Sequence, residues 1–330
     1  MRILVYGAGV IGSYLAHVLC AAQHDVTLLA RGVRKAELEQ NGLVIRHYTQ
    51  RTTTNDHPHI TDTLDPTEPY DAIFVVMQYQ QMKSILSDLA QADCPLVVLV
   101  GNNLSAKEME RTIHEKSPSP KTVLFGFQGT GGKREEGQNV CVRLKHSGLE
   151  CGLLKSEPDA HTKSVLEQLF NGSPYKLAYQ AGMDDWYKCH LAFILPICYI
   201  CYAVDCDLTK ASNRQLRQVM DAACECYGML RAQGCSILPE GEEAYFVPGP
   251  KRVLMLAMLW IMAKTALGRL AASDHCRNAV TEMENLDRDF QAVRAKAADF
   301  PMPVWDSIRD SMPGWETLRV KFSGAKQKGA

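Results

Sequence analysis

The sequence predicts an α/β fold, in which an N-terminal domain with a parallel sheet precedes an all-α C-terminal domain. Over the first half of the chain, short apolar runs alternate with segments of helical periodicity, which is typical of parallel strands covered by helices. From Trp186 onward, apolar side chains recur almost entirely at helical spacing. The 330 residues suffice for two hydrophobic cores. We expect the two domains to span residues 1–180 and 181–330.

The first domain begins with a strand, a turn and a helix. Ile3–Tyr6 is a short apolar run, Val10–Gln23 carries apolar residues at helical spacing, and Asp25–Ala30 is a second strand. Ala72–Met77 and Leu96–Val100 are continuous apolar runs, which indicate strands buried on both faces. The strands expected to complete this domain are Thr122–Phe127, Asn139–Leu144 and Glu150–Leu154, with turns at Gly129–Gly132 and Gly137 between the first two.

The second domain is expected to be built from four helical runs. These are Trp186–Val204, Gln215–Gln233, Lys251–Ala272 and a run that ends near Ala298. Within the third run, Val253–Ala263 is apolar on every side, so it must be covered by neighbouring helices or by a second subunit. A homodimer is therefore a possible assembly.

Composition argues against several classes of protein. The chain has 36 basic and 37 acidic residues and a formal charge of -1, so no positive field favours nucleic acid. The longest apolar runs, Leu191–Val204 and Val253–Ala263, are shorter than the about 20 residues that span a bilayer. Most cysteines lie in apolar runs, as reduced thiols of a cytosolic protein do. We expect a cytoplasmic protein with neither nucleic acid nor a membrane as its partner.

A glycine-rich turn joins the first strand to the first helix, and its sequence is Gly7-Ala8-Gly9-Val10-Ile11-Gly12. Gly7 permits the tight turn, Gly9 lets the backbone approach a pyrophosphate, and Gly12 allows the helix to pack closely on the strand. The helix N-terminus attracts the anion. Because the motif lies in a strand–turn–helix–strand unit, it predicts a Rossmann-type dinucleotide-binding domain in which all six residues contact the cofactor.

The end of the second strand indicates which dinucleotide binds. Enzymes that use NAD usually carry an acidic residue there, for the 2′-hydroxyl of the adenine ribose. This chain has Ala30-Arg31 instead, with Arg34 and Lys35 just behind. Since Arg31 offers a planar, permanently charged fork to a 2′-phosphate, we expect NADP as the cofactor.

A nicotinamide enzyme that reduces a carbonyl also needs a proton donor near the developing alkoxide. Lysine is suited to this role, because partial burial lowers its pKa and its charge stabilises the oxyanion. Lys188 opens an apolar helix directly after the expected domain boundary. A lysine whose head group simply reaches solvent explains the same pattern. As catalytic residues, Glu282 and Glu284 are favoured by spacing alone even less than Lys188, because charged faces of helices are usually solvated.

Over nearly its whole length the chain resembles the ketopantoate reductase family (2-dehydropantoate 2-reductase). The resemblance is carried by the opening from Arg2 through Gly12 to Leu29-Ala30-Arg31, by Asp71–Val76, by Trp186-Tyr187-Lys188, and by Thr281-Glu282-Met283-Glu284, with Asp274 upstream. It implies an active site between the two domains and hydride transfer from NADPH to ketopantoate, which gives pantoate for pantothenate synthesis.

The resemblance also implies roles for individual residues. Lys188 corresponds to the general acid, and Glu282 to the glutamate that holds the substrate hydroxyl. Asn102, in Gly101-Asn102-Asn103, matches an asparagine near the nicotinamide ribose and the substrate, so it is expected to contact both. Gln78 stands near the cofactor, where the family often has lysine.

The residues expected to recognise the substrate depart from the family pattern. Ala192 replaces an asparagine, Pro196 another polar residue, and Leu270 a serine for which the neighbouring Ser273 is a substitute. Each lost hydrogen-bond partner costs a polar substrate about 1–3 kcal/mol. The pocket therefore suits 2-dehydropantoate or a more apolar keto acid or imine. A non-catalytic NADP-binding sensor is a third possibility.

Cysteines form one further motif, the pair in Cys198-Tyr199-Ile200-Cys201, with Cys189 and Cys206 nearby. Four thiolates are a zinc ligand set. A single pair inside an apolar helix, without a second pair at matching spacing, is weak evidence for a metal, and we expect none. A redox-active dithiol is equally weakly indicated.

Overall fold

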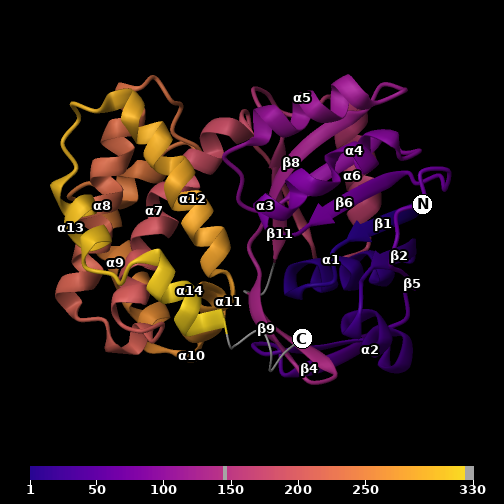
Figure 1. The fold of residues 1–330 in the computed structure, drawn as a ribbon, viewed down its shortest axis with the longest axis horizontal. Helices are drawn as coiled ribbons and strands as arrows, with labels where there is room; N and C mark the ends of the chain where they lie inside the picture. Colours follow the sequence, from indigo (N-terminus) through magenta and orange to yellow (C-terminus); the bar gives the residue numbers. More distant parts are fainter. Residues whose placement is uncertain (144–146, 324–330) are drawn as a thin grey trace. The chain divides into compact units, whose positions relative to one another are not determined.

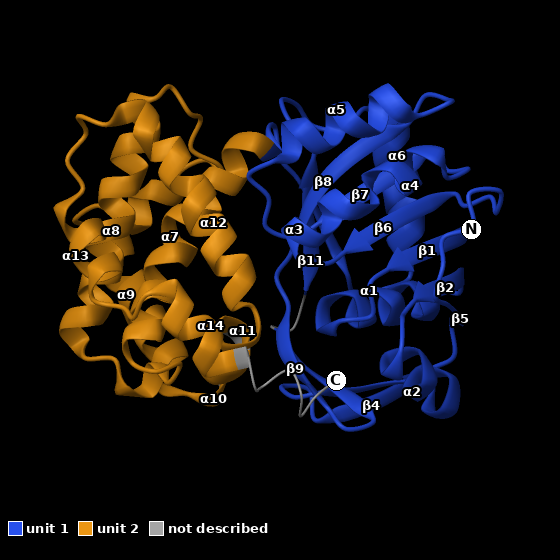
Figure 2. Cartoon of the chain, viewed as in Figure 1, with its two compact units in different colours: residues 1–183, 329–330 blue, residues 184–328 orange. Residues whose placement is uncertain are grey.

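The structure is a computed structural model that describes residues 1–143 and 147–323 (Figure 1). The chain forms two compact units that divide after Met183 (Figure 2), where the sequence analysis expects a boundary after residue 180. Unit 1 contains both sheets, and unit 2, from Asp184 onward, is helical. No helix among the described residues is both long enough and apolar enough to span a membrane.

The main sheet of unit 1 has eight strands in the order β12-β11-β8-β7-β6-β1-β2-β5. All neighbouring strands run parallel except β11 and β8, which are antiparallel. The sheet is therefore the parallel Rossmann-type sheet that the sequence predicts, extended at one edge by two reversed strands, β11 and β12. Its strands are β1 (Arg2–Tyr6), β2 (Asp25–Leu29), β5 (His59–Thr61), β6 (Ala72–Val76), β7 (Leu96–Val100), β8 (Thr122–Gln128), β11 (Gly148–Gly152) and β12 (Lys176–Tyr179).

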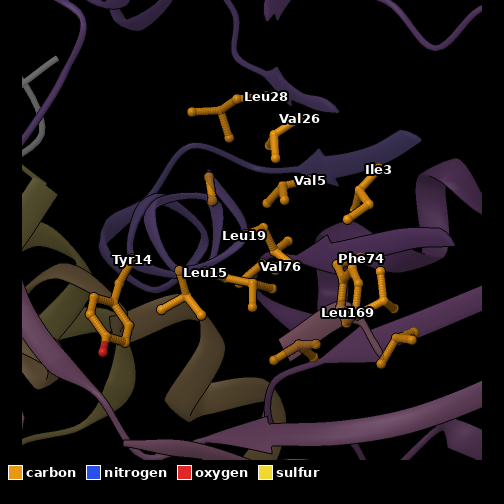
Figure 3. Close-up of a cluster of buried hydrophobic side chains, with 14 of the residues drawn as sticks. Ile3, Val5, Tyr14, Leu15, Leu19, Val26, Leu28, Phe74, Val76 and Leu169 are labelled. Atoms are coloured by element: carbon orange, nitrogen blue, oxygen red, sulfur yellow. The ribbon is translucent and has the colours of Figure 1, made fainter. Parts of the chain in front are cut away.

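One face of this sheet packs against α1 and α6, and Figure 3 shows the resulting core. Phe74 and Val76 of β6 meet Leu15 and Leu19 of α1 and Leu169 of α6 in one buried cluster. Alternate residues of the same strands are buried on the other face as well, which explains their continuous apolar runs. The helices are α1 (Val10–Ala21), α2 (Val33–Asn41), α3 (Tyr79–Met82), α4 (Leu86–Gln91), α5 (Ala106–Lys116) and α6 (Ala160–Phe170).

A second sheet of four strands was not predicted. Its order is β4 (Thr52–Asp56), β3 (Leu43–His47), β10 (Gln138–Val142) and β9 (Gly131–Glu135). The expected turn at Gly129–Gly132 is therefore wrong in its second half, because Gly131 and Gly132 begin β9 and pair with β10. The strand expected at Asn139–Leu144 exists but belongs to this sheet, and Leu144 lies outside the described residues.

Unit 2 has eight α-helices among its described residues and one five-residue π-helix. The helix expected over Lys251–Ala272 is wrong as a single element, since α9 ends at Lys264, Thr265 is extended, and Arg269–Ser273 is π-helical. The helices are α7 (Met183–Ala203), α8 (Asn213–Ala232), α9 (Pro250–Lys264), α10 (Ala266–Gly268), the π-helix η4 (Arg269–Ser273), α11 (Asp274–Asn278), α12 (Val280–Arg294), α13 (Pro303–Asp310) and α14 (Trp315–Ser323).

Helices α7 and α12 run antiparallel along each other inside unit 2. The Tyr199 hydroxyl donates to Asp287 at 2.7 Å, and Tyr202, later in α7, donates to the carbonyl oxygen of Cys276, which precedes α12, at 2.9 Å. Asp287 is almost fully buried and also accepts hydrogen bonds from Arg309 of α13 and Trp315 of α14. One carboxylate thus joins four helices.

Candidate active site

The parallel register of unit 1 brings the predicted cofactor residues to one edge of the main sheet. Tyr6 at the end of β1 pairs with Leu29 of β2 and with Val75 of β6. Val76 pairs in turn with Val100 of β7. The residues one or two positions after these strands therefore lie along a common carboxyl edge, where parallel α/β sheets bind their ligands. They are Gly7, Arg31, Gln78 and Asn102.

The glycine turn has the geometry that its sequence predicts. Gly7 has a φ of 122°, and a Cβ there would lie 2.2 Å from the carbonyl oxygen of Val76. A Cβ on Gly12 would lie 1.9 Å from the carbonyl oxygen of Gly7. A Cβ on Gly9 would meet no atom within 4 Å. Two of the glycines are thus required by the protein's own packing, whereas at Gly9 the backbone is open to a ligand.

Side chains from inside unit 1 hold this turn in place. Ser13 Oγ donates to the carbonyl oxygen of Ala8 at 3.2 Å, and Arg34 Nε donates to the same oxygen at 3.2 Å. Gln128 Nε2 donates to the carbonyl oxygen of Ile11 at 3.3 Å. Arg34 is buried, and burial, together with the nearby charge of Arg134, lowers its pKa despite the hydrogen bond to Glu37. A positive charge therefore lies directly behind the turn.

Arg31 is exposed at the end of β2. Its Nη2 donates to the Tyr6 hydroxyl at 2.6 Å, and its Nε donates to the carbonyl oxygen of Asp62 at 3.1 Å. The Asp62 carboxylate is bound instead by Lys35, at 2.7 Å. Arg31 is thus held in place by hydrogen bonds to two neutral oxygen atoms, and its charge also lowers the pKa of Asp62.

Gln78 and Asn102 continue the same edge. Gln78 precedes the short helix α3, and its Oε1 accepts a hydrogen bond from Gln80 at 2.8 Å. Asn102 is 8% exposed, and its Oδ1 has no hydrogen-bond partner. A buried acceptor without a donor is destabilising unless a ligand supplies one. The open backbone at Gly9 and the unpaired oxygen of Asn102 therefore both fit a bound dinucleotide.

Lys188 lies in the first turns of α7 and pairs with two carboxylates. Its Nζ is 2.8 Å from Asp184 Oδ2 and 2.9 Å from Asp185 Oδ1. Burial acts to lower the pKa of Lys188, but the hydrogen bonds to Asp184 and Asp185 outweigh it, and the net pKa lies well above its usual value. The expectation that burial lowers this pKa is therefore wrong, because the acids three and four residues earlier share its face of the helix.

Glu282 is buried in the first turn of α12, where the helix dipole favours a negative charge. His275 Nε2 lies 3.7 Å from its carboxylate. Cys198 of α7 contacts Met283, so Glu282 lies beside α7 near Cys198. Cys198 is ten residues beyond Lys188. This spacing corresponds to about 15 Å along the helix axis. The structure therefore does not bring Lys188 and Glu282 together.

The residues near the expected substrate positions are packed inside unit 2. Ala192, Pro196 and Leu270 are all buried. The Ser273 hydroxyl is buried too, accepts a hydrogen bond from the Leu208 amide at 3.4 Å and lies 3.9 Å from Cys201 Sγ. A role for Ser273 in substrate binding stays a prediction that this packing does not favour.

Three functional neighbours were missed by the sequence analysis. Asp184 and Asp185 precede Lys188 by four and three residues, a spacing that predicts ion pairs on one helix face. Gln128, which anchors the glycine turn, is the last residue of β8, more than a hundred positions after that turn, and no local pattern indicates it. Arg34 was expected only as a basic neighbour of Arg31.

Comparison with known proteins gives a family and a fold. Residues 3–154 match the family model described as ketopantoate reductase PanE/ApbA, whereas no curated protein matches the chain.

Several solved structures share the fold over almost the whole chain. One is the ternary structure of D-mandelate dehydrogenase with NADH and anilino(oxo)acetate, at 14% identity, with a TM-score of 0.70 and coverage of 98% of this chain and 100% of that one. A 2-dehydropantoate 2-reductase from Geobacter metallireducens GS-15 is 16% identical, with a TM-score of 0.69 and coverage of 94% and 98%.

A PanE/ApbA family ketopantoate reductase from Ralstonia eutropha JMP134 is 15% identical, with a TM-score of 0.66 and coverage of 98% and 100%. At these identities the likeness to solved structures shows the shared fold. The segment that matches the family model, residues 3–154, contains the glycine turn, Arg31 and the strands that follow them. The resemblance predicted from the sequence is thereby confirmed over residues 3–154, which match the ketopantoate reductase family model.

Proposed function

We propose that the protein is an NADPH-dependent reductase that converts a 2-oxo acid to the 2-hydroxy acid. The observation that carries this proposal is the carboxyl edge of the main sheet. There the backbone at Gly9 has no protein atom near its Cβ position, and the buried Oδ1 of Asn102 has no hydrogen-bond donor. The family match supports the same reading. Solved relatives of the same fold include enzymes named for the reduction or oxidation of such acids.

NADPH is preferred to NADH because of the charges beside the turn. Arg31 is exposed and its hydrogen bonds go to neutral oxygen atoms, while Arg34 adds a buried positive charge behind Ala8. A guanidinium group binds a 2′-phosphate through two parallel hydrogen bonds. The D-mandelate dehydrogenase of similar fold was solved with NADH. The preference of this chain for NADPH over NADH therefore has to be tested directly.

The bound cofactor supplies a hydride to the carbonyl carbon of the substrate, and the chain's own residues do the rest. Lys188 Nζ donates a proton to the carbonyl oxygen as the hydride adds to the carbon. Its raised pKa keeps it protonated near neutral pH, and the substrate oxygen replaces one of its two carboxylate contacts. Asn102 Oδ1 accepts a hydrogen bond from the nicotinamide ribose. The role of Glu282 toward a substrate hydroxyl stays a prediction from the family resemblance, because the structure does not bring Glu282 and Lys188 together.

Ketopantoate is the first candidate substrate, because the motifs around Lys188 and Glu282 match the family that reduces it. A more apolar 2-oxo acid is the second. It is favoured by Ala192, Pro196 and Leu270, which replace polar residues of the family, and a relative of the same fold was solved with the aromatic anilino(oxo)acetate.

The decisive experiment follows NADPH oxidation with a panel of 2-oxo acids that includes ketopantoate, short aliphatic acids and aromatic acids. We expect the highest kcat/KM for ketopantoate, and a higher value for a bulky apolar acid would establish the second candidate.

Lys188→Ala should lower kcat about 10²–10⁴-fold with unchanged NADPH affinity, whereas Lys296→Ala serves as an exposed control. Tight NADPH binding without turnover of any acid would contradict both candidates and leave a sensor.

We also propose a cytoplasmic homodimer that forms through α9. All twelve cysteines are free thiols, as in a reducing compartment. Helix α9 exposes a row of large apolar side chains, of which Val253 is 70% exposed; the others are Leu254, Met258, Trp260 and Ile261. Leu254→Asp should convert a dimer to monomers in sedimentation velocity, whereas Val33→Asp, on an exposed valine of unit 1, should leave it unchanged. A monomeric wild-type protein would refute this assembly.

A further inference from the structure

Four cysteine side chains meet in one place inside unit 2. Cys198 and Cys201 belong to α7, Cys206 follows that helix, and Cys276 lies in α11. The sulfur atoms of Cys198 and Cys276 are 3.5 Å apart. The Cys201 thiol is hydrogen-bonded to both Cys206 and Cys276, and all four residues are buried. We call this group the thiol cluster.

The end of α7 holds two members of the thiol cluster against each other. The Cys206 amide donates to the carbonyl oxygen of Cys201 at 2.8 Å, and the Asp205 amide donates to that of Tyr202 at 3.1 Å. This is the hydrogen-bond pattern of a Schellman motif, in which the third residue before the helix end contacts the second residue after it. Asp205 and Cys206 both adopt left-handed φ angles, of 61° and 53°. The backbone therefore fixes the contact between Cys201 and Cys206.

The surroundings of the thiol cluster favour a thiolate on Cys201. Hydrogen bonds from Cys206 and Cys276 lower the pKa of Cys201, and they outweigh its burial; the Ser273 hydroxyl and the charge of Arg277 act in the same direction. The same contacts raise the pKa of Cys206. One sulfur thus becomes a nucleophile beside a thiol that keeps its proton, which is the arrangement of a reactive dithiol.

A cavity borders this pair at Cys206, whereas Cys201 lies behind Cys206 and is not among the residues of the wall. It has a volume of about 590 Å³, and Cys206 forms part of its wall. Four basic side chains and two acidic ones also line it, so it is polar and positively charged; these are Lys210, Lys264, Arg269, Arg277, Asp205 and Asp207. Cys198 and Cys276 are not among the residues of the wall.

Metal binding does not account for the thiol cluster. Among the residues that the structure describes, no group of three or more histidine, cysteine, aspartate or glutamate side chains has a geometry that could hold a metal ion. The contacts between sulfur atoms therefore point to sulfur redox chemistry.

We propose that Cys201 and Cys206 form a reversible intramolecular disulfide when the protein meets a hydroperoxide. The Cys201 thiolate attacks one peroxide oxygen, the O–O bond breaks, and Cys201 becomes a sulfenic acid while hydroxide leaves. The hydroxide takes the proton of Cys206 and becomes water, and the resulting Cys206 thiolate displaces the sulfenic oxygen as hydroxide. This second hydroxide becomes water by taking up the proton that Cys201 released when it ionised. In sum, two thiols and hydrogen peroxide give one disulfide and two waters. An external dithiol reverses the step.

The experiment treats the reduced full-length protein with hydrogen peroxide, blocks the remaining thiols after denaturation and maps the product. We expect the count of free thiols to fall from twelve to ten. Chymotryptic cleavage after Tyr202 separates Cys201 from Cys206, so the disulfide joins two peptides that dithiothreitol releases. Twelve thiols that persist while the protein stays folded, or a bond mapped to Cys198 and Cys276, would overturn the proposal.

Variants provide a second and independent measurement. Cys201→Ser should slow peroxide-dependent thiol loss at least about tenfold, because it removes the thiolate. Cys206→Ser should abolish the crosslink while Cys201 still oxidises to a sulfenic acid that a dimedone probe labels. Cys226→Ser, at a buried cysteine of α8 outside the thiol cluster, is the matched control and should behave as the wild type. Equal rates in all three variants would contradict the assignment. The wild-type mapping stands even where a variant fails to fold.

Discussion

Asp184 and Asp185 set the protonation of Lys188, and this has a consequence for the pH dependence of turnover. A general acid works only while protonated, so activity falls as the pH rises through the pKa of Lys188. Both aspartates raise that pKa. Their presence therefore extends activity toward alkaline pH, and they act as positioning residues for the ammonium group.

Asp184→Asn removes one of these charges and should move the alkaline limb of the kcat profile to lower pH. The affinity for NADPH should stay the same, because the predicted cofactor residues all belong to unit 1 and Asp184 belongs to unit 2. Asp207→Asn, at an exposed aspartate of the same unit that pairs with Lys210 at 3.5 Å, is the control. An alkaline limb that stays in place would mean that Lys188 does not titrate in the rate-limiting step.

Arg31 tests the choice of cofactor at the scale of one side chain. Charged hydrogen bonds contribute about 1.5–3 kcal/mol each, so Arg31→Ala should weaken NADPH binding about 10–100-fold and leave NADH nearly unchanged. Fluorescence titration with the two cofactors measures both affinities. Lys35→Ala, whose charge is already paired with Asp62, should have a smaller effect. An equal loss for both cofactors would contradict contact with the 2′-phosphate.

At the scale of the element, the β1–α1 turn separates the needs of folding from those of binding. Gly12→Ala places a methyl group against the carbonyl oxygen of Gly7 and should destabilise unit 1 by about 1–3 kcal/mol, as overpacking does. Gly9→Ala meets no atom of the protein, so its free energy of unfolding should stay near that of the wild type while NADPH affinity falls. Urea unfolding and cofactor titration measure the two effects. A stable Gly12→Ala protein would show that the turn relaxes.

The elements that the sequence predicts well are those with a strong local signal. Strands β1, β6 and β7 are buried on both faces, and their continuous apolar runs predict this burial. Strand β4 consists of polar residues, Thr52–Asp56, and its pairing with β3 depends on contacts that no short window contains. Likewise, the apolar periodicity of residues 251–272 continues through Thr265, where the backbone turns extended and α9 ends.

The candidate site was predictable to a similar degree. The glycine turn and Arg31 follow from a motif whose geometry is local, and the structure places them on one sheet edge. The relation between Lys188 and Glu282 depends instead on how α7 and α12 align, and the antiparallel contacts from Tyr199 to Asp287 separate the two side chains along the helices. The engagement of Ser273 by Leu208 is another long-range contact that sequence spacing does not reveal.

At the scale of the whole molecule, buried histidines and the carboxylate of Asp287 determine the response to acid. In unit 1, burial lowers the pKa of His47 to about 4, with the positive charges of His17 and Arg143 adding to the effect. In unit 2, hydrogen bonds from Arg309 and Tyr199 outweigh burial and lower the pKa of Asp287. The unfolded values are about 6.5 for histidine and 3.9 for aspartate.

Both units should therefore lose stability over the same range of pH, because burial also lowers the pKa of His190 in unit 2 to about 4. Below about pH 6.5 His47 is protonated in the unfolded chain, whereas in the folded unit it is protonated only below about pH 4. The free energy of unfolding therefore falls as the pH is lowered between these two values. The contribution of Asp287 is present above about pH 3.9 and is lost below it. Urea unfolding at several pH values should show a shallower fall between these limits in His47→Gln. An unchanged slope would exclude His47 as the group responsible.

The shared carboxylate of Asp287 also bears on how the protein is made. Its donors Arg309 and Trp315 are synthesised after α12, and each reaches back to a charge that is almost completely enclosed. While the ribosome still holds the residues beyond α12, that charge has only Tyr199 and Gln291 to bind it. A buried anion with part of its partners missing is strongly destabilising. The helical unit therefore reaches its native state only after translation has passed Trp315, and a nascent chain that stalls earlier remains exposed to proteases.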